Sequence, residues 1–145
     1  MSEQMPGLPG PRPDPATVGY WEAAGRGELV VQRCSACGTD RHPPTQVCYV
    51  CNSLDWTWEP HSGRGRVFSY TWVDRPILPA LAPLGAYNTT VVELEGTTGV
   101  VRILSRVTDA ERDDLAIGMP VEVHFDPVGD GVALPVFRTR AEGDR

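Results

Sequence analysis

The chain has 145 residues, 41% hydrophobic and 22% charged, which is typical of a folded protein of one or two small domains. This length excludes an enzyme built alone on a large α/β scaffold. All thirteen basic residues are arginine and nineteen residues are acidic, giving a net charge of -6. The lack of lysine excludes Schiff-base chemistry and a P-loop phosphate site, and the negative charge disfavours nonspecific binding to nucleic acid or an anionic membrane.

Residues 1–15 are rich in proline and glycine, which predicts an extended tail or linker rather than a domain. Such a segment fits either a partner-binding arm or the remnant of a fusion to an upstream domain. It carries neither the basic region nor the apolar run of a signal peptide, so we expect a cytoplasmic protein. No stretch reaches the ~18 consecutive apolar residues of a membrane-spanning helix.

Residues 16–60 are predicted to form a short helix followed by a metal-binding ribbon. Asp14 can cap the helix and Pro15 suits its first position, with Tyr20 and Trp21 as apolar anchors. Residues 28–33 and 56–59 have the composition of short strands, and Pro60 is expected to end the second.

The four cysteines of the chain form two C-x-x-C pairs separated by ten residues: Cys34, Cys37, Cys48 and Cys51. Each tight turn directs two sulfurs at one ion, and structural zinc takes four such ligands in a tetrahedron. Gly38 and Asn52 follow the two pairs and tolerate the backbone that such turns require. The spacing therefore predicts one structural zinc ion per chain, in a closed site without a catalytic water.

Three other uses of these cysteines remain open at this point. Two disulfides would require a secreted protein, and a thioredoxin-like motif would require a βαβ unit that the pattern lacks. An iron–sulfur cluster could use the same four thiolates. We favour zinc, because a ribbon this small needs a metal to fold.

Residues 61–145 read as a series of β-strands, expected over residues 66–74, 87–94, 100–107, 121–125 and 133–138. In the first strand Phe68, Tyr70 and Trp72 alternate with smaller residues. Thr108 and Glu111 form a capping-box pattern that predicts a helical turn over 108–115. Five strands and a short helix fit an OB-fold barrel, so the fold class is mainly β.

No catalytic residue is assigned. His42, His61 and His124 lie in no motif that activates a nucleophile, and the paired carboxylates fit a solvated surface. If zinc uses all four cysteines, no thiol remains for chemistry.

The order of these features resembles a bacterial and archaeal family formerly called domain of unknown function 35. In that family a rubredoxin-like zinc ribbon is joined to an acyl-CoA-associated OB-fold. The resemblance covers about residues 16–140 and rests on residues 20–21, 34–38, 43–44, 48–51, 62–71, 117–123 and 134–138.

This resemblance implies an accessory subunit rather than a free enzyme. Members accompany thiolase-like acyl-CoA enzymes, including archaeal acetyl-CoA acetyltransferase with hydroxymethylglutaryl-CoA synthase, and lipid-transfer-protein-type aldolases of steroid side-chain degradation. Some are fused behind a hotdog-fold hydratase. The implied function is a non-catalytic scaffold in a hetero-oligomer, which stabilises its enzyme and helps to hold a coenzyme A thioester as a shared ligand.

Residues 76–84 are apolar, uncharged and proline-rich, which predicts a loop that contacts a protein or an acyl chain, or else a lid over the barrel. Three nearby arginines could hold the phosphates of coenzyme A or be plain solvated charges. The candidate contacts are Tyr20, Trp21, Arg64, Arg66, Arg75, Ile77, Leu78, Leu81 and Leu84.

The alternative function is a single-stranded nucleic-acid-binding module, because zinc ribbons and OB-folds commonly bind single strands through aromatic residues. Charge argues against it. The first 60 residues carry four arginines and seven acidic residues, and the remaining 85 carry nine and twelve, so each part has a net charge of -3. A basic stripe that would follow phosphates is missing.

Overall fold

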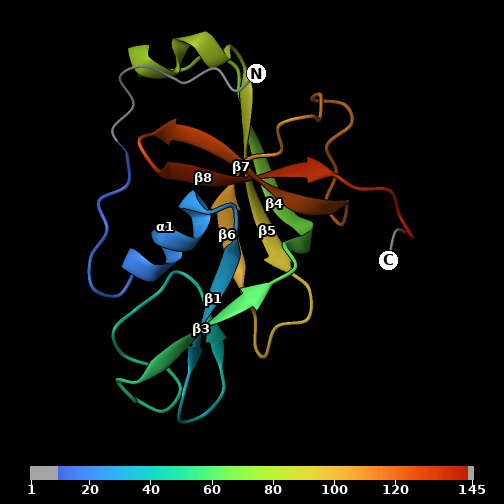
Figure 1. Cartoon of the computed structure of the whole chain (residues 1–145). Coiled ribbons are helices and arrows are strands. Elements are labelled where there is room, and N and C mark those ends of the chain that lie inside the picture. Colours follow the sequence, from blue (N-terminus) through green and yellow to red (C-terminus); the bar gives the residue numbers. More distant parts are fainter. Residues whose placement is uncertain (1–9, 144–145) are drawn as a thin grey trace.

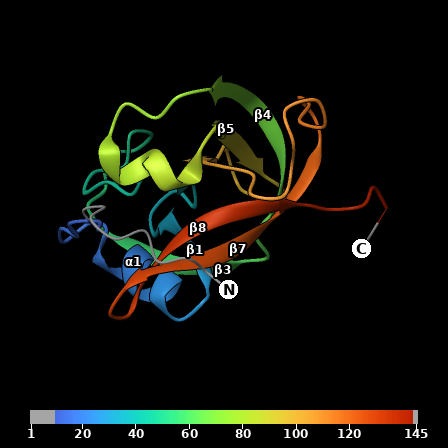
Figure 2. The same cartoon turned by 90° about the horizontal axis from the view of Figure 1, so that it is seen from above.

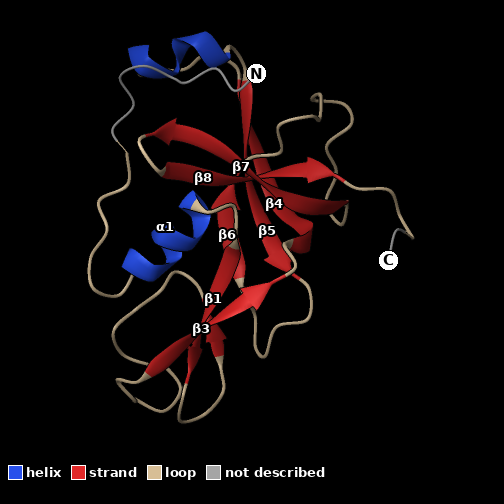
Figure 3. Cartoon of the chain, in the orientation of Figure 1, coloured by secondary structure: helices blue, strands red, loops and turns tan. Residues whose placement is uncertain are grey.

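Two antiparallel sheets and two short helices make up residues 10–143, the part of the chain described by this computed structural model (Figures 1 and 3). The first nine residues of the expected tail lie outside the described residues. The elements in chain order are α1 (Val18–Gly25), β1 (Leu29–Cys34), β2 (Asp40–Arg41), β3 (Trp56–His61), β4 (Arg64–Val73), η1 (Pro79–Leu84), β5 (Tyr87–Leu94), β6 (Arg102–Ser105), β7 (Pro120–Gly129) and β8 (Val132–Thr139).

The smaller sheet is the ribbon, with strand order β2-β1-β3. Asp14 Oδ1 accepts hydrogen bonds from the backbone N–H groups of Ala16 and Thr17, but residues 15–17 form a turn, and the helix begins at Val18, later than expected, with Thr17 as its N-cap. The expectation that Pro60 ends the last strand is wrong: Pro60 pairs with Val30 and β3 continues to His61. Since β3 is an edge strand, a residue without an N–H group can lie within it.

The larger sheet has the order β6-β5-β4-β7-β8 and curls into a nearly closed barrel. Closure comes from the residues that follow β6. The N–H of Phe137 in β8 donates a hydrogen bond to Arg106 O, and the carbonyl of Phe137 accepts a hydrogen bond from Thr108 N, at 2.9 Å each. The predicted fold class, mainly β with a short helix, a zinc ribbon and an OB-type barrel, is confirmed.

The regular alternation expected in the first barrel strand is broken by a bulge between Val67 and Ser69. Val67 is buried, whereas Phe68 is 45% exposed and lies under the guanidinium of Arg102, 3.6 Å from the ring centroid. Trp72 packs against the core. The strand aromatics therefore do not form one continuous face.

The expected helical turn over 108–115 is shorter than the pattern suggests. Leu115 N donates to Glu111 O, which closes one turn, but Thr108 does not cap it. The Thr108 hydroxyl instead donates to Phe137 O of β8. This residue is used to close the barrel, and the capping-box pattern is not realised.

One hydrophobic core joins the ribbon and the barrel, because Tyr20, Leu29 and Val31 belong to the same cluster as Val92 and Phe137. Figure 1 shows α1 beside both units, and Figure 2 shows α1 and η1 on the same side of the barrel. Within the described residues, neither helix combines the length and apolar character needed to cross a bilayer.

Candidate functional site

The two cysteine pairs are held in matching turns. Gly38 N donates to Cys34 O at 2.9 Å, and Asn52 N donates to Cys48 O at 2.8 Å. Both Gly38 (φ 75°) and Asn52 (φ 62°) adopt the left-handed backbone that the sequence pattern predicts for these positions. Each turn therefore presents two sulfurs to the same side.

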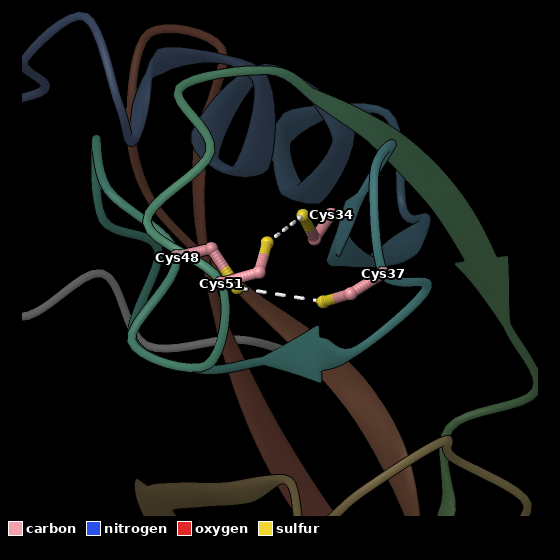
Figure 4. Close-up of side chains that lie close together, drawn as sticks. All are labelled: Cys34, Cys37, Cys48 and Cys51. Carbon is pink, nitrogen blue, oxygen red and sulfur yellow. Dashed lines mark hydrogen bonds between the residues drawn. The ribbon is translucent and has the colours of Figure 1, made fainter.

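The four sulfurs converge on one point (Figure 4). Cys34 Sγ lies 3.6 Å from Cys51 Sγ, Cys37 Sγ lies 3.7 Å from Cys48 Sγ, and all four ligand atoms lie within 4.8 Å of one another. A tetrahedral zinc ion with Zn–S bonds of about 2.3 Å requires S–S separations of about 3.8 Å. The cluster fits one metal ion, with no ligand position left for water.

Backbone donors favour the thiolate form of two of these cysteines, whereas burial and the neighbouring thiols raise the pKa of Cys51 to about 12. The N–H of Cys37 lowers the pKa of Cys34 to about 6, and the N–H of Cys51 likewise lowers the pKa of Cys48. The thiolate is the form that coordinates zinc. The turns thus favour the ligand form of the two buried cysteines.

A buried carboxylate connects the ribbon to the barrel beside this centre. Asp40, only 2% exposed, accepts two hydrogen bonds from the Arg33 side chain, at 2.7 and 3.1 Å. Its Oδ2 also accepts the backbone N–H of Thr98, in the loop between β5 and β6, at 2.8 Å. The ribbon is therefore held to the barrel by the hydrogen bond between Asp40 and Thr98 as well as by the shared core.

A cleft of about 480 Å³ opens between α1, η1 and the barrel, and its walls are mostly apolar. It brings together four of the candidate contacts from distant parts of the sequence: Tyr20, Trp21, Leu81 and Leu84. Sequence reasoning did not assign its other wall, from the loop after β2 and from β6 and β8: His42, Pro43, Pro44, Ile103, Leu104, Leu134, Pro135 and Val136. The Pro43–Pro44 pair was the available signal, since it excludes regular structure there.

The remaining candidates lie elsewhere. Ile77 is 95% exposed and Leu78 is 58% exposed, just before η1. Arg64 and Arg66 lie at the start of β4 and Arg75 follows its end, so Arg66 and Arg75 are about 30 Å apart along the strand. Arg66 also pairs with Glu95 and Glu142. The three arginines do not form a single basic spot.

Two family models match the chain. The ChsH2 rubredoxin-like zinc ribbon domain matches residues 21–57, and the ChsH2 C-terminal OB-fold domain matches residues 58–126. A DUF35 domain-containing scaffold protein of Methanothermobacter thermautotrophicus is 30% identical over 101 residues, which cover 69% of this chain and 73% of the relative. The chain belongs to the DUF35 family.

A solved structure described as "Ltp2-ChsH2(DUF35) aldolase" matches with a TM-score of 0.78 and 36% identity, over 89% of this chain and 98% of that chain. A probable enoyl-CoA hydratase alpha subunit of Thermomonospora curvata is 38% identical over 94% of the chain. A 3-oxo-4,17-pregnadiene-20-carboxyl-CoA hydratase alpha subunit of Mycobacterium tuberculosis is 33% identical over 75%. The matches span only 42% and 33% of these two longer relatives.

Proposed function

We propose that this chain is a non-catalytic scaffold subunit that binds and stabilises a thiolase-like acyl-CoA enzyme. Within that class, we propose the aldolase of steroid side-chain degradation as its partner. The observation that carries the proposal is the match to the DUF35 chain of the Ltp2-ChsH2 aldolase, at 36% identity over 89% of the chain. The relative named as a pregnadiene-carboxyl-CoA hydratase subunit supports the steroid context.

The arrangement of the chain's own residues supports a scaffold. All four cysteines converge on the metal centre, so no thiol is left for covalent chemistry. Two relatives far longer than the chain are named hydratase alpha subunits, so the proposal includes a hotdog-fold hydratase unit as a neighbour or an upstream fusion partner.

The exposed residues before η1 are the proposed contact with the enzyme. A side chain as apolar and as exposed as Ile77, at 95%, is costly in water and is stabilised when a partner covers it. Arg75 lies next to this segment, and we propose it as a contact for the phosphates of a shared coenzyme A thioester; Arg64 lies at the other end of β4 and is not part of that contact. Arg66 is engaged by two carboxylates and is the weaker candidate.

Co-expression tests the scaffold. A lipid-transfer-protein-type aldolase produced together with this chain should copurify with it and gain both solubility and activity. An aldolase that is equally soluble and active without the chain would contradict the proposal.

A double variant, Ile77→Ser with Leu78→Ser, tests the contact surface. It should reduce copurification at least tenfold, because two exposed apolar side chains no longer bury area against the enzyme. The control is Ile117→Ser, which alters an equally apolar residue that is 71% exposed in the turn before β7. Equal loss in both variants would show that the segment has no special role.

The nucleic-acid alternative receives little support from the aromatic residues. Arg102 covers the ring of Phe68, and Trp72 packs against the core, so the three aromatic side chains do not form one platform on which bases could stack. Salt-dependent binding of an oligonucleotide below about 1 µM would reverse this ranking.

A further inference from the structure

Several polar side chains that line the cleft between α1, η1 and the barrel are satisfied within the protein. Asn88 exchanges hydrogen bonds with the backbone N–H and C=O of Val107, at 2.8 Å each. Ser105 donates to Pro135 O at 2.7 Å. Arg106 pairs with Asp126 at 3.1 Å, and Thr17 bonds to Asp14. These groups leave the cleft without an available charge.

Five lining side chains differ, because the described residues provide no hydrogen-bond partner for them: Tyr20, Trp21, His42, Tyr87 and Thr89. Tyr20 comes from α1 and His42 from the loop after β2, yet their rings lie 5.1 Å apart at one wall of the cleft. Tyr20 is only 5% exposed. Its hydroxyl is not one of the fully buried polar atoms that lack a partner, so it remains accessible at the cleft, where a ligand can accept its hydrogen bond.

Both side chains stay uncharged at neutral pH. Burial raises the pKa of Tyr20, so its hydroxyl keeps its proton. Burial lowers the pKa of His42 to about 4, so its imidazole is neutral. This corner of the cleft therefore offers neutral donors, which suit a carbonyl oxygen and not a phosphate or carboxylate.

We propose that the cleft binds an uncharged apolar molecule that carries a ketone or similar carbonyl group, and that the Tyr20 hydroxyl donates a hydrogen bond to that oxygen beside His42. The volume of about 480 Å³ is that of a small-molecule site and accommodates a rigid ring system. Trp21, Leu81 and Leu84 supply the apolar walls. The scaffold proposal assigns no ligand to this cleft; the choice of steroid probes rests on the proposed steroid context.

The zinc-loaded full chain should be titrated with progesterone, an apolar diketone, and binding followed by calorimetry. We expect saturable binding of one molecule per chain. Tyr20→Phe keeps the ring and removes only the hydroxyl, so it should weaken binding about 5- to 30-fold. The matched control is Tyr70→Phe, a tyrosine on β4 that is 38% exposed and outside the cleft; it should bind like the wild type.

A second variant, Leu81→Asp, places a charge on the apolar wall and should abolish binding. Circular dichroism and zinc content show whether each variant is folded. A parallel titration uses the coenzyme A thioester of a 3-oxo steroid acid. If progesterone binds in the low micromolar range and the thioester does not, the ligand is a free ketone. If the thioester binds in that range and progesterone does not, the ligand is the acyl part of a thioester.

The inference is overturned if neither probe binds saturably to the chain or to its complex with an aldolase. It is also overturned if folded Tyr20→Phe and Leu81→Asp bind as tightly as the wild type, because the probe then lies outside the cleft. Loss of progesterone binding when the aldolase is added, with no binding to the complex, would identify the cleft as a protein contact and contradict the proposal.

Discussion

Replacing Asp40 by asparagine tests the carboxylate that stabilises the ribbon and joins it to the barrel. The carboxylate accepts two hydrogen bonds from Arg33 and one from Thr98 N, and an amide of the same shape cannot accept all three. Both carboxylate oxygens accept from Arg33, so the NH2 group faces the guanidinium in either orientation, and in one of them it also faces the Thr98 N–H. At least one charge-assisted hydrogen bond is therefore lost and a donor is left opposed.

The expected cost is about 2 kcal/mol in the free energy of unfolding, because charge-assisted hydrogen bonds contribute roughly 1.5–3 kcal/mol each. We take a value in the lower half of this range, since the Arg33 side chain is 37% exposed and keeps a second carboxylate, Glu59, at 3.6 Å. For a chain of this size, such a change lowers Tm by roughly 4–8 °C.

The assay is urea unfolding of the zinc-loaded protein at pH 7, followed by circular dichroism. The control is Asp130→Asn, which removes an exposed carboxylate in the β7–β8 turn and should change stability by less than about 0.5 kcal/mol. If the two variants lose equal stability, the interaction of Asp40 with Arg33 and Thr98 does not hold the ribbon as argued.

The pH dependence provides a second test of the same carboxylate. Burial alone would raise the pKa of Asp40, but the hydrogen bonds from Arg33 and Thr98 outweigh it and hold the pKa below its usual value. A lowered carboxyl pKa stabilises the fold above the unfolded value of about 3.9, and this stabilisation is lost as pH falls through the folded pKa. The difference between wild type and Asp40→Asn should be constant from pH 8 to about 5.5. A difference that grows on acidification would contradict the reasoning.

Two further substitutions test the metal centre and the packing of the first barrel strand. Cys34→Ser, or removal of zinc by a chelator, should unfold the ribbon and abolish its near-ultraviolet tryptophan signal, because the metal contributes directly to folding. The control is Ser35→Ala, a substitution of the exposed neighbouring residue. A ribbon that stays folded without metal would contradict a structural role. Gly65→Ala should destabilise the barrel by about 1–3 kcal/mol, because its Cβ would lie 2.6 Å from Glu93 O and β5 would have to shift. The control is Gly129→Ala, which has open space around it and should leave the urea midpoint unchanged. Equal urea midpoints for the two variants would refute the close approach at Gly65.

The sequence predicts well those features of this protein that depend on residues close together in the chain. The C-x-x-C spacing, with Gly38 and Asn52 after the pairs, is sufficient to predict both turns, because each is specified within five residues. The strand expected over 87–94 coincides with β5, whose inward residues alternate with outward ones. Pro60 was misjudged because the rule that proline ends a strand depends on whether that strand lies at an edge, which only the sheet order reveals.

The cleft could not be predicted in the same way. The sequence indicates that Leu81 and Leu84 belong to an apolar segment, but they meet Tyr20 and His42 only through the packing of η1, α1 and the ribbon loop around the barrel. The bulge beside Phe68 likewise arises from the pairing of β4 with β5. Both features depend on contacts between residues that are distant in the chain.

Helix α1 has a consequence for how this protein can be divided or recombined. A Cβ added at Gly19 would lie 2.3 Å from Trp58 Nε1 of the ribbon, and one added at Gly25 would lie 2.2 Å from Gly131 O at the tip of the β7–β8 hairpin. The helix is thus seated against both units through residues that have no side chain. The ribbon and the barrel therefore cannot be exchanged independently. In a chimera between two relatives, α1, β3 and the tip of the β7–β8 hairpin should all come from the same parent protein.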